Sequence, residues 1–158
     1  MCGFLSRPAT LARQHVAQQV IHDRITTIDA DVVKERVAAK LQGPHHLAFL
    51  MAVLHCLHRN DGVALLANVF DALSDDGALF VWSLTLDDTR LAPDFAVNYS
   101  LALLNEYDAG QAHTFGEYED WLKSAGFNAA EKVAENSFVA WKSKSGRHRG
   151  RVVIRSQV

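Results

Sequence analysis

The chain has 158 residues, of which 49% are hydrophobic and 22% charged, with a formal net charge of −2. This length and composition predict a single globular domain, and the near-neutral charge excludes a general electrostatic attraction to nucleic acid or anionic membranes. No apolar run approaches the ~20 residues that a bilayer-spanning helix needs. Only two cysteines occur, Cys2 and Cys56, which argues against a disulfide framework and predicts a cytoplasmic protein.

Short alternating elements are predicted in the N-terminal part of the chain. Residues 6–19 form a helical pattern with Pro8 in the first turn, and the β-branched run 24–28 predicts a strand. Asp31 can cap a second helix, which would end before the Gly43-Pro44 pair. The apolar positions expected to face the core are Leu11, Ala12, Val16 and Val20 in the first helix and Val33, Val37 and Leu41 in the second.

The most informative stretch begins with an almost unbroken apolar run, His46 to Leu54, which predicts a strand buried on both faces of a parallel sheet. Asn60 or Asp61 can cap the next helix, and Gly77 suits a left-handed residue at its end before a second apolar strand. His55 follows the carboxyl end of the first strand, where open α/β sheets bind ligands. The helix positions expected to face inward are Val63, Leu66, Phe70 and Leu73.

Two further helices and a hairpin are predicted in the C-terminal part. A helix is expected over residues 95–106, and a capping box from Thr114 to Glu117 opens another that stops at Gly126. Two strands, 127–135 and 137–142, would then pair antiparallel. The order of elements predicts an α/β architecture, mostly parallel with an antiparallel C-terminal edge. Inward positions are expected at Val97, Leu101 and Leu104, and then at Phe115, Tyr118, Leu122 and Ala125.

The sequence also contains features that could indicate a metal site or a phosphate-binding tail. His45, His46, His55, Cys56 and His58 could suggest a metal site, but no second paired cluster stands at a recognised spacing, so no metal is predicted. Residues 143–158 form a basic tail that could contact phosphates. Because the tail has no interleaved aromatic residues, a flexible solvated segment without nucleic-acid binding is the prediction.

Several motifs together resemble a known family. The run HLAFLMAVLHCLHRNDGVALLANVFDALSDDGALFV and the later Thr114-Phe-x-Glu-Tyr-x-x-Trp-Leu-x-x-Ala-Gly-Phe127 are similar to the C-terminal part of class I S-adenosylmethionine-dependent O-methyltransferases, of the plant caffeate type and the bacterial small-molecule type. Residues 24–31 resemble the strand that ends in the family's Gly-Asp motif. The resemblance implies a truncated Rossmann-like sheet, with residues 1–142 forming a partial methyltransferase domain that lacks the family's glycine-rich cofactor loop.

The resemblance also implies a reaction and its residues. The family transfers a methyl group from S-adenosylmethionine to a hydroxyl of a small aromatic molecule, and His55 matches its general base. The two carboxylates that flank this base in plant members fall at Ser83 and Ala112. A non-catalytic degenerate fragment, acting as a folded remnant or partner subunit, is the competing interpretation. From the sequence alone, a strand-end histidine bonded to backbone is the favoured interpretation of His55, and the resemblance makes the two interpretations about equal.

The cofactor and substrate positions are implied in the same way. Asp31 matches the residue near the adenine amino group, although it could also serve as a plain helix cap. Ser6 falls at the ribose position, and Met51 falls where plant members carry a lysine. The implied positions are Asp31, Val32, Ser6 and Met51 for the cofactor and Phe95, Asn98, Tyr99 and Leu103 for the substrate.

A missing central strand is the last consequence of the resemblance. The family's first strand would lie between residues 2–5 and the strand that precedes His55. Two unpaired strand edges favour self-association. The sequence therefore predicts either a rearranged sheet or a strand supplied by a second chain, for instance in a homodimer.

Overall fold

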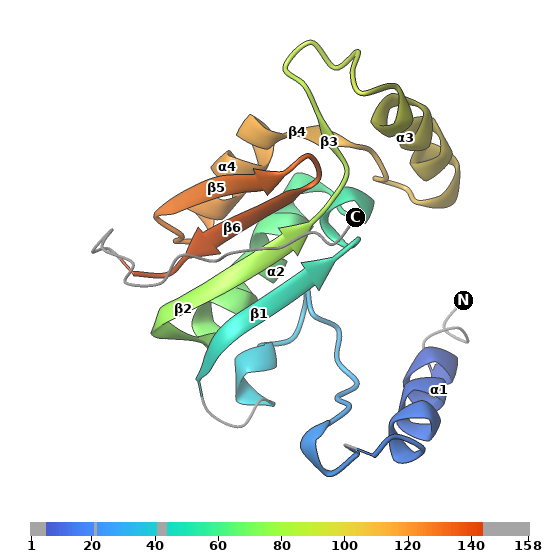
Figure 1. The fold of residues 1–158 in the computed structure, drawn as a ribbon, viewed down its shortest axis with the longest axis vertical. Coiled ribbons are helices and arrows are strands. Elements are labelled where there is room, and N and C mark those ends of the chain that lie inside the picture. The colour runs from blue at the N-terminus through green and yellow to red at the C-terminus, as the bar shows by residue number, and fades with distance from the viewer. Residues whose placement is uncertain (1–5, 21, 41–43, 144–158) are drawn as a thin grey trace. The chain divides into compact units, whose positions relative to one another are not determined.

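The computed structural model describes residues 6–20, 22–40 and 44–143. Contacts divide the chain into two units, Met1–Asp31 and Val32–Val158. Residues 2–5 and the basic tail from residue 144 onward lie outside the described residues. Figure 1 shows the elements of both units.

The first unit holds helix α1, Ser6–Ala17, and the single 3-10 turn η1, His22–Arg24. The helix confirms the predicted element to within two residues. Its predicted inward face is wrong, because Leu11 is 63% exposed and Val20, beyond the helix end, is 96% exposed. Of the four expected positions, Ala12 is also exposed and Val16 is half-buried. The described part of this unit offers little surface on which an apolar stripe could pack.

The strand predicted over residues 24–28 is absent from the described part of this unit. Residues 25–31 are irregular, and Ile25 and Ile28 are 39% and 36% exposed. β-branched residues favour extended backbone, but a strand also needs a neighbouring strand with which to share hydrogen bonds. No described segment supplies one here.

The second unit opens with an irregular segment in place of the predicted helix from Asp31. Only the 3-10 turn η2, Val37–Ala39, forms among residues 32–40. Contacts with the following helix favour this arrangement: Asn68 Nδ2 donates to the Val32 carbonyl at 3.0 Å, and Arg36 pairs with Asp71 at 3.1 Å. Tertiary contacts of this kind override the weak intrinsic preference of a short segment for helix.

A four-stranded mixed sheet forms the centre of this unit. Its strands are β1 (His45–Met51), β2 (Leu73–Trp82), β5 (Ala129–Ala134) and β6 (Ser137–Trp141), in the order β1-β2-β6-β5. β1 and β2 are parallel, whereas β6 pairs antiparallel with β2 and with β5. The predicted α/β class and antiparallel C-terminal edge are confirmed.

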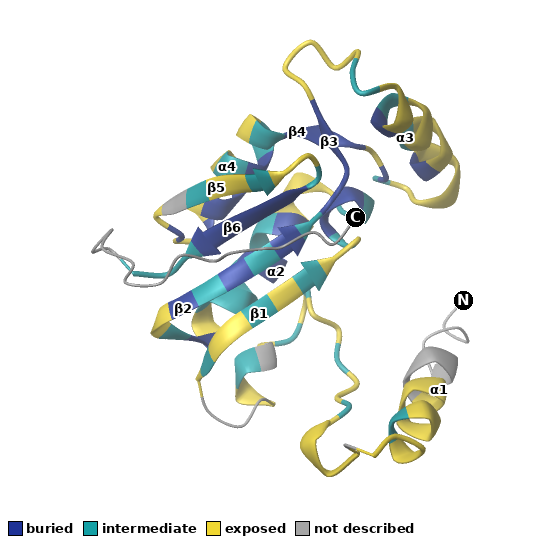
Figure 2. Cartoon of the chain, viewed as in Figure 1, coloured by how far each residue is buried: buried dark blue, intermediate teal, exposed yellow. Residues whose placement is uncertain are grey.

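Strand β1 lies at the edge of this sheet and is not buried on both faces as predicted. Leu47, Phe49 and Met51 are 52%, 61% and 54% exposed on one face, as the yellow stretches of β1 in Figure 2 show. The strand ends at Met51, three residues before the predicted end. Its other edge has no partner among the described residues, because β2 is its only neighbour in the sheet.

Helix α2, Arg59–Ala72, joins the two parallel strands. Asn60 and Asp61 lie in its first turn and do not cap it, because the N-cap is His58. Gly77 does not end the helix in a left-handed conformation either. It lies buried inside β2, where a Cβ would stand 2.9 Å from the Ser74 carbonyl oxygen.

The register explains the position of Gly77. His45 pairs with Leu73 and Leu47 pairs with Ala78, so residues 74–77 bulge out opposite one residue of β1. A bulge of this kind bends a strand locally and interrupts its pairing. The close approach of neighbouring backbone, and not a positive φ, is therefore what requires glycine at this position.

Helix α3, Asp94–Glu106, confirms the predicted element but packs through a different face. Ala96 and Leu103 are buried, and the predicted inward residue Val97 packs against the same cluster. The predictions for Leu101 and Leu104 are wrong, because these side chains are 61% and 57% exposed. The Ser100 hydroxyl lies on the buried side and accepts from the Ala112 N–H at 2.9 Å. A small two-stranded sheet that was not predicted, β3 (Thr85–Leu86) and β4 (His113–Thr114), lies beside α3.

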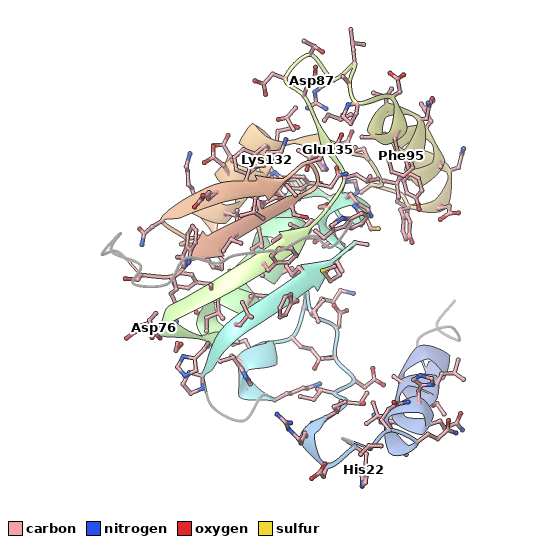
Figure 3. All side chains as sticks on the ribbon, in the orientation of Figure 1. His22, Asp76, Asp87, Phe95, Lys132 and Glu135 are labelled. Carbon is pink, nitrogen blue, oxygen red and sulfur yellow. The ribbon has the colours of Figure 1, made fainter. Side chains whose placement is uncertain are left out.

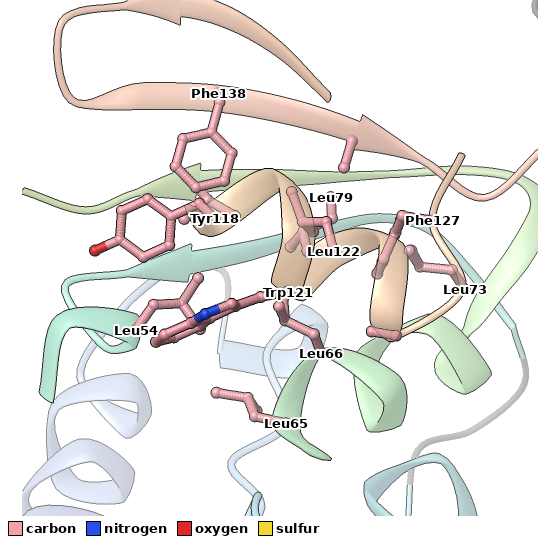
Figure 4. Packing of buried hydrophobic residues seen from close by; sticks show 13 residues of the cluster. Leu54, Leu65, Leu66, Leu73, Leu79, Tyr118, Trp121, Leu122, Phe127 and Phe138 are labelled. Atoms are coloured by element: carbon pink, nitrogen blue, oxygen red, sulfur yellow. The ribbon is translucent and has the colours of Figure 1, made fainter. Parts of the chain in front are cut away.

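Helix α4, Phe115–Ser124, begins at the predicted capping box. Thr114 Oγ1 accepts from the Glu117 N–H at 3.3 Å, and a Glu117 carboxylate oxygen accepts from the Thr114 N–H at 2.8 Å. Gly126 follows with φ +105°, as predicted for a helix end. Figure 4 shows α4 and α2 packed against the sheet around a core. Its buried members include Leu65, Leu66, Leu73, Leu79, Val81, Tyr118, Trp121, Leu122 and Phe138.

Candidate functional site

The chain leaves β1 through a residue with unusual backbone geometry. Ala52 has φ +58°, in the left-handed region that non-glycine residues rarely adopt, and its N–H donates to the Trp82 carbonyl at 2.9 Å. The 3-10 turn η3, Leu54–Cys56, follows directly. It places His55 beyond the carboxyl end of β1 with 4% of its surface exposed. The position predicted from the sequence is therefore confirmed.

A chain of buried hydrogen bonds surrounds His55 Nδ1. Ser83 Oγ lies 3.1 Å from this nitrogen, and the Leu84 N–H donates to it at 3.3 Å. Ser83 Oγ also lies 2.8 Å from Tyr118 Oη, which donates to the Leu84 carbonyl at 3.1 Å. Ser83, Leu84 and Tyr118 are almost fully buried. The ring orientation of His55 is therefore set by polar groups from the end of β2 and from α4.

The turn between β5 and β6 holds the end of β2 in place. The Asn136 carbonyl accepts from the Ser83 N–H at 2.9 Å, and Asn136 Oδ1 accepts from the Thr85 N–H at 3.0 Å. Thr85 Oγ1 donates to the Ser83 carbonyl at 2.9 Å. These bonds satisfy the backbone on both sides of Leu84, so the Leu84 N–H is left to point at His55.

Burial favours the neutral form of His55. Desolvation lowers the pKa of His55 below its ordinary value, and the nearby His113 lowers it further. The pKa of Tyr118 is raised, mainly because its hydroxyl is enclosed in the core. At pH 7 the site therefore consists of neutral hydrogen-bonding groups and contains no buried charge.

A second buried histidine lies close by. His113 is 4% exposed, both of its ring nitrogens lack hydrogen-bond partners among the described residues, and burial lowers its pKa. Its Nδ1 is 3.8 Å from Glu117 Oε1, which pairs with Arg90 at 2.6 Å. Burial raises the pKa of Glu117, but the Thr114 N–H and Arg90 outweigh this effect and hold it below its ordinary value.

His113 also lines a polar cavity of about 300 Å³ between the start of α2, the α3–β4 connection and α4. The residues around the cavity include Arg59, Asp108, Gln111 and Glu117, but not His55. The Gln111 N–H nevertheless donates to the His55 carbonyl at 2.9 Å. The α3–β4 connection therefore joins the two histidine environments.

The two positions implied for carboxylates carry no charge. Ser83 contacts His55 through its hydroxyl, whereas Ala112 is 1% exposed within the apolar cluster beside α3. An imidazolium at His55 would consequently lack a buried negative charge to stabilise it. Instead of a carboxylate, the Ser83 hydroxyl contacts His55 Nδ1, and the Tyr118 hydroxyl contacts that of Ser83.

The implied substrate residues are divided between two faces of α3. Phe95 and Tyr99 are 62% and 46% exposed, with their ring centroids 5.7 Å apart, and Asn98 is also exposed. Figure 3 shows Phe95 on this helix. Leu103 is buried in a cluster with Leu84, against which Cys56 packs. Of the four residues, Leu103 is thus the one that shares an apolar cluster with neighbours of His55.

The implied cofactor residues are divided between the two units of the chain. Val32 lines an apolar cavity of about 230 Å³ between β1 and α2, and Met51 is not among the residues around it. Met51 is 54% exposed at the end of β1. Asp31 belongs to the first unit, and Ser6 opens α1, where its side chain is not described. Within the second unit, Val32 and Met51 therefore do not line the same cavity.

Some residues that shape this site carry no local sequence signal. Tyr118 was expected only as a core residue, and neither His113 nor Asn136 was singled out. The capping box correctly located Tyr118 on a helix, but no local pattern indicates that its hydroxyl meets a residue 35 positions away. Among the described residues no group of three or more His, Cys, Asp or Glu could hold a metal ion, and no helix is long and apolar enough to cross a membrane.

A mixed α/β sheet with a buried histidine directly after a strand's carboxyl end is the arrangement of an α/β ligand-binding or enzyme domain. Comparison with known proteins narrows this class. Residues 5–128 match the O-methyltransferase domain family. The chain belongs to this family.

Individual relatives agree with this assignment. The 3-hydroxy-5-methyl-1-naphthoate 3-O-methyltransferase of Streptomyces sahachiroi is 30% identical over 129 residues, which cover 82% of this chain and 36% of that protein. Two solved structures are each 25% identical: an O-methyltransferase from Nostoc punctiforme, with a TM-score of 0.73, and PigF with SAH, with a TM-score of 0.74. They match 84% and 89% of this chain and 41% of their own chains. The chain therefore spans less than half the length of these relatives.

Proposed function

We propose that this chain forms the acceptor side of an S-adenosylmethionine-dependent O-methyltransferase that acts on a hydroxyl of a small aromatic molecule. His55 is the residue that meets the acceptor oxygen. The observation that carries this proposal is the position of His55 in a family fold, beyond the carboxyl end of β1, with its ring fixed by Ser83, Leu84 and Tyr118.

The nature of the acceptor is supported by the relatives. The Streptomyces sahachiroi relative is named for a hydroxynaphthoate, and an enzyme from Solanum habrochaites, 30% identical over 98 residues, is named for myricetin. Both names denote hydroxylated aromatic compounds. The apolar cluster that joins Leu103 to Leu84 and Cys56 provides an apolar wall near His55 that suits an aromatic ring.

The methyl donor of the family is S-adenosylmethionine. S-adenosylmethionine, when bound, supplies a methyl group carried on a sulfonium. Because Val32 and Met51 of the second unit do not line the same cavity, we expect this chain to bind that molecule weakly by itself.

Transfer of a radioactive methyl group from S-adenosylmethionine to 4-nitrophenol, whose hydroxyl ionises near neutral pH, tests the proposal. The full chain is expected to label the acceptor slowly, and His55→Phe is expected to lose the labelling. His46→Phe is a matched control, because His46 is 84% exposed by its side chain and pairs with Asp76 at the far end of β1. Equal labelling by wild type and His55→Phe would show that His55 does not meet the acceptor.

A non-catalytic role is the second candidate, and the replacement of both carboxylate positions by Ser83 and Ala112 favours it. In that case the chain would be a folded partner subunit or remnant. Calorimetric titration with S-adenosylmethionine separates the two functions: heat of binding supports the enzyme, and absence of heat at millimolar concentration supports the remnant.

Self-association through β1 is the partner arrangement that we propose. The strand has a free edge among the described residues, and Leu47, Phe49 and Met51 expose an apolar face beside it. Unpaired edges of this kind pair with other chains unless they are blocked. Sedimentation should show a dimer that Phe49→Lys shifts towards monomer, and a monomer at every accessible concentration would contradict this arrangement.

A further inference from the structure

We infer that His55 is held with its proton on Nε2, so that it presents an N–H to the acceptor oxygen and not the lone pair of a base. The inference rests on the proposed function for the identity of the ligand. The position of the proton itself depends only on the hydrogen bonds around Nδ1.

The Leu84 N–H decides where the proton lies. It donates to His55 Nδ1 at 3.3 Å, and no other acceptor for it is found among the described residues. Its neighbours Ser83 and Thr85 direct their N–H groups to Asn136 instead. Leu84 is 1% exposed, so water cannot replace the bond. A proton on Nδ1 would therefore strand a buried backbone donor.

The hydroxyl groups nearby accommodate this arrangement. Tyr118 donates to the Leu84 carbonyl at 3.1 Å, and Ser83 can donate to Tyr118 Oη at 2.8 Å or to His55 Nδ1 at 3.1 Å. A hydroxyl can serve as donor or acceptor, whereas a backbone N–H can only donate. The fixed donor therefore sets the tautomer, and the hydroxyls rotate to suit it.

Nε2 is the atom left for a ligand. It has no hydrogen-bond partner among the described residues. Both ring nitrogens of His113 are fully enclosed without a partner, whereas His55 Nε2 is not enclosed in this way. In the neutral ring, a proton on Nε2 means that this side donates. The acceptor that such a group binds best is an oxygen anion, because a charged acceptor strengthens the hydrogen bond.

The ligand class follows from this chemistry. A phenolate already carries the lone pair and negative charge that the Nε2–H stabilises, whereas a neutral phenol would need a base to remove its proton. We therefore assign the site to hydroxyaromatic compounds whose hydroxyl is ionised near neutral pH. In this assignment His55 positions and stabilises the oxygen anion and does not remove a proton from it.

Nitrogen-15 spectra of the histidine rings in the full chain test the tautomer without any cofactor or substrate. The His55 signals, assigned by their loss in His55→Gln, should show the Nε2–H form in at least about tenfold excess, since stranding a buried donor disfavours the other form by about this factor or more. Ser83→Ala should keep the same form, because the Leu84 N–H remains.

Ser83→Asp serves as the opposite control, since a carboxylate beside Nδ1 should draw the proton to that nitrogen. A predominant Nδ1–H form in the wild type, or a change of tautomer in Ser83→Ala, would overturn the inference. The methyl-transfer assay tests the proposed function independently, because the Nε2–H tautomer of His55 can be observed even in a chain that transfers no methyl group.

Discussion

The Tyr118 hydroxyl provides a direct test of the buried network around His55. Tyr118 is 0% exposed, and its oxygen lies 2.8 Å from Ser83 Oγ and 3.1 Å from the Leu84 carbonyl. Tyr118→Phe removes both bonds but keeps the ring, whose centroid lies 5.3 Å from that of Phe138. Each lost bond is worth roughly 0.5–1.5 kcal/mol, so we expect a loss of about 2 kcal/mol in the free energy of unfolding.

Urea unfolding at pH 7, followed by tryptophan fluorescence, measures this loss. The midpoint should fall while the slope of the transition stays constant, because the buried area hardly changes. Tyr99→Phe is the matched control: its ring is 46% exposed on α3, and the substitution should change stability by less than about 0.5 kcal/mol. Equal effects of the two substitutions would refute the role assigned to the Tyr118 hydroxyl.

Three further predictions concern stability. Ala52→Gly should stabilise the chain by about 0.5–1 kcal/mol, because φ of Ala52 is +58°. The control Ala67→Gly, inside α2, should destabilise it by about 1 kcal/mol. If both substitutions shifted the urea midpoint in the same direction, the backbone strain at Ala52 would be contradicted. Gly62→Ala should destabilise the chain by about 1 kcal/mol, because the new Cβ would stand 2.5 Å from the Trp121 ring. This clash outweighs the gain in helix propensity from glycine to alanine. An unchanged urea midpoint would show that the Trp121 ring moves aside. Folding lowers the pKa values of His55 and His113, so their contribution to the free energy of unfolding should be complete above about pH 6.5 and be lost as the pH falls below it. The total loss is about 1.4 kcal/mol for each unit by which folding lowers a pKa. A free energy of unfolding that does not change between pH 7 and pH 5 would contradict the burial of these histidines.

Local patterns predicted the elements of the second unit well. The capping box at Thr114 and the positive φ at Gly126 depend on residues close in sequence and are found where expected. The apolar runs of β1 and β2 also form strands, although β1 ends three residues before its predicted end and β2 begins at Leu73, inside the predicted helix. His55 was located for the same reason, because it follows an apolar strand directly.

Features that depend on distant partners could not be read from local patterns. The segment after Asp31 stays irregular because Asn68 and Asp71 of α2 bind it, and β1 is exposed because no described element covers its outer face. At the site, the contact of Tyr118 with Ser83 and the bond from the Leu84 N–H to His55 join segments far apart in the sequence. The tautomer of His55 follows from those bonds alone.

Binding of 4-nitrophenol, observed through the Nε2 signal of His55, tests the central claim most directly, because this probe ionises near neutral pH. On the alkaline side of its ionisation, the probe should shift the His55 signal saturably and leave that of the exposed His46 unchanged. On the acid side, where the probe is neutral, the shift should weaken markedly. A stronger response to the neutral phenol, or no response of His55 to either form, would contradict the claim that His55 meets an aromatic oxygen anion as a hydrogen-bond donor.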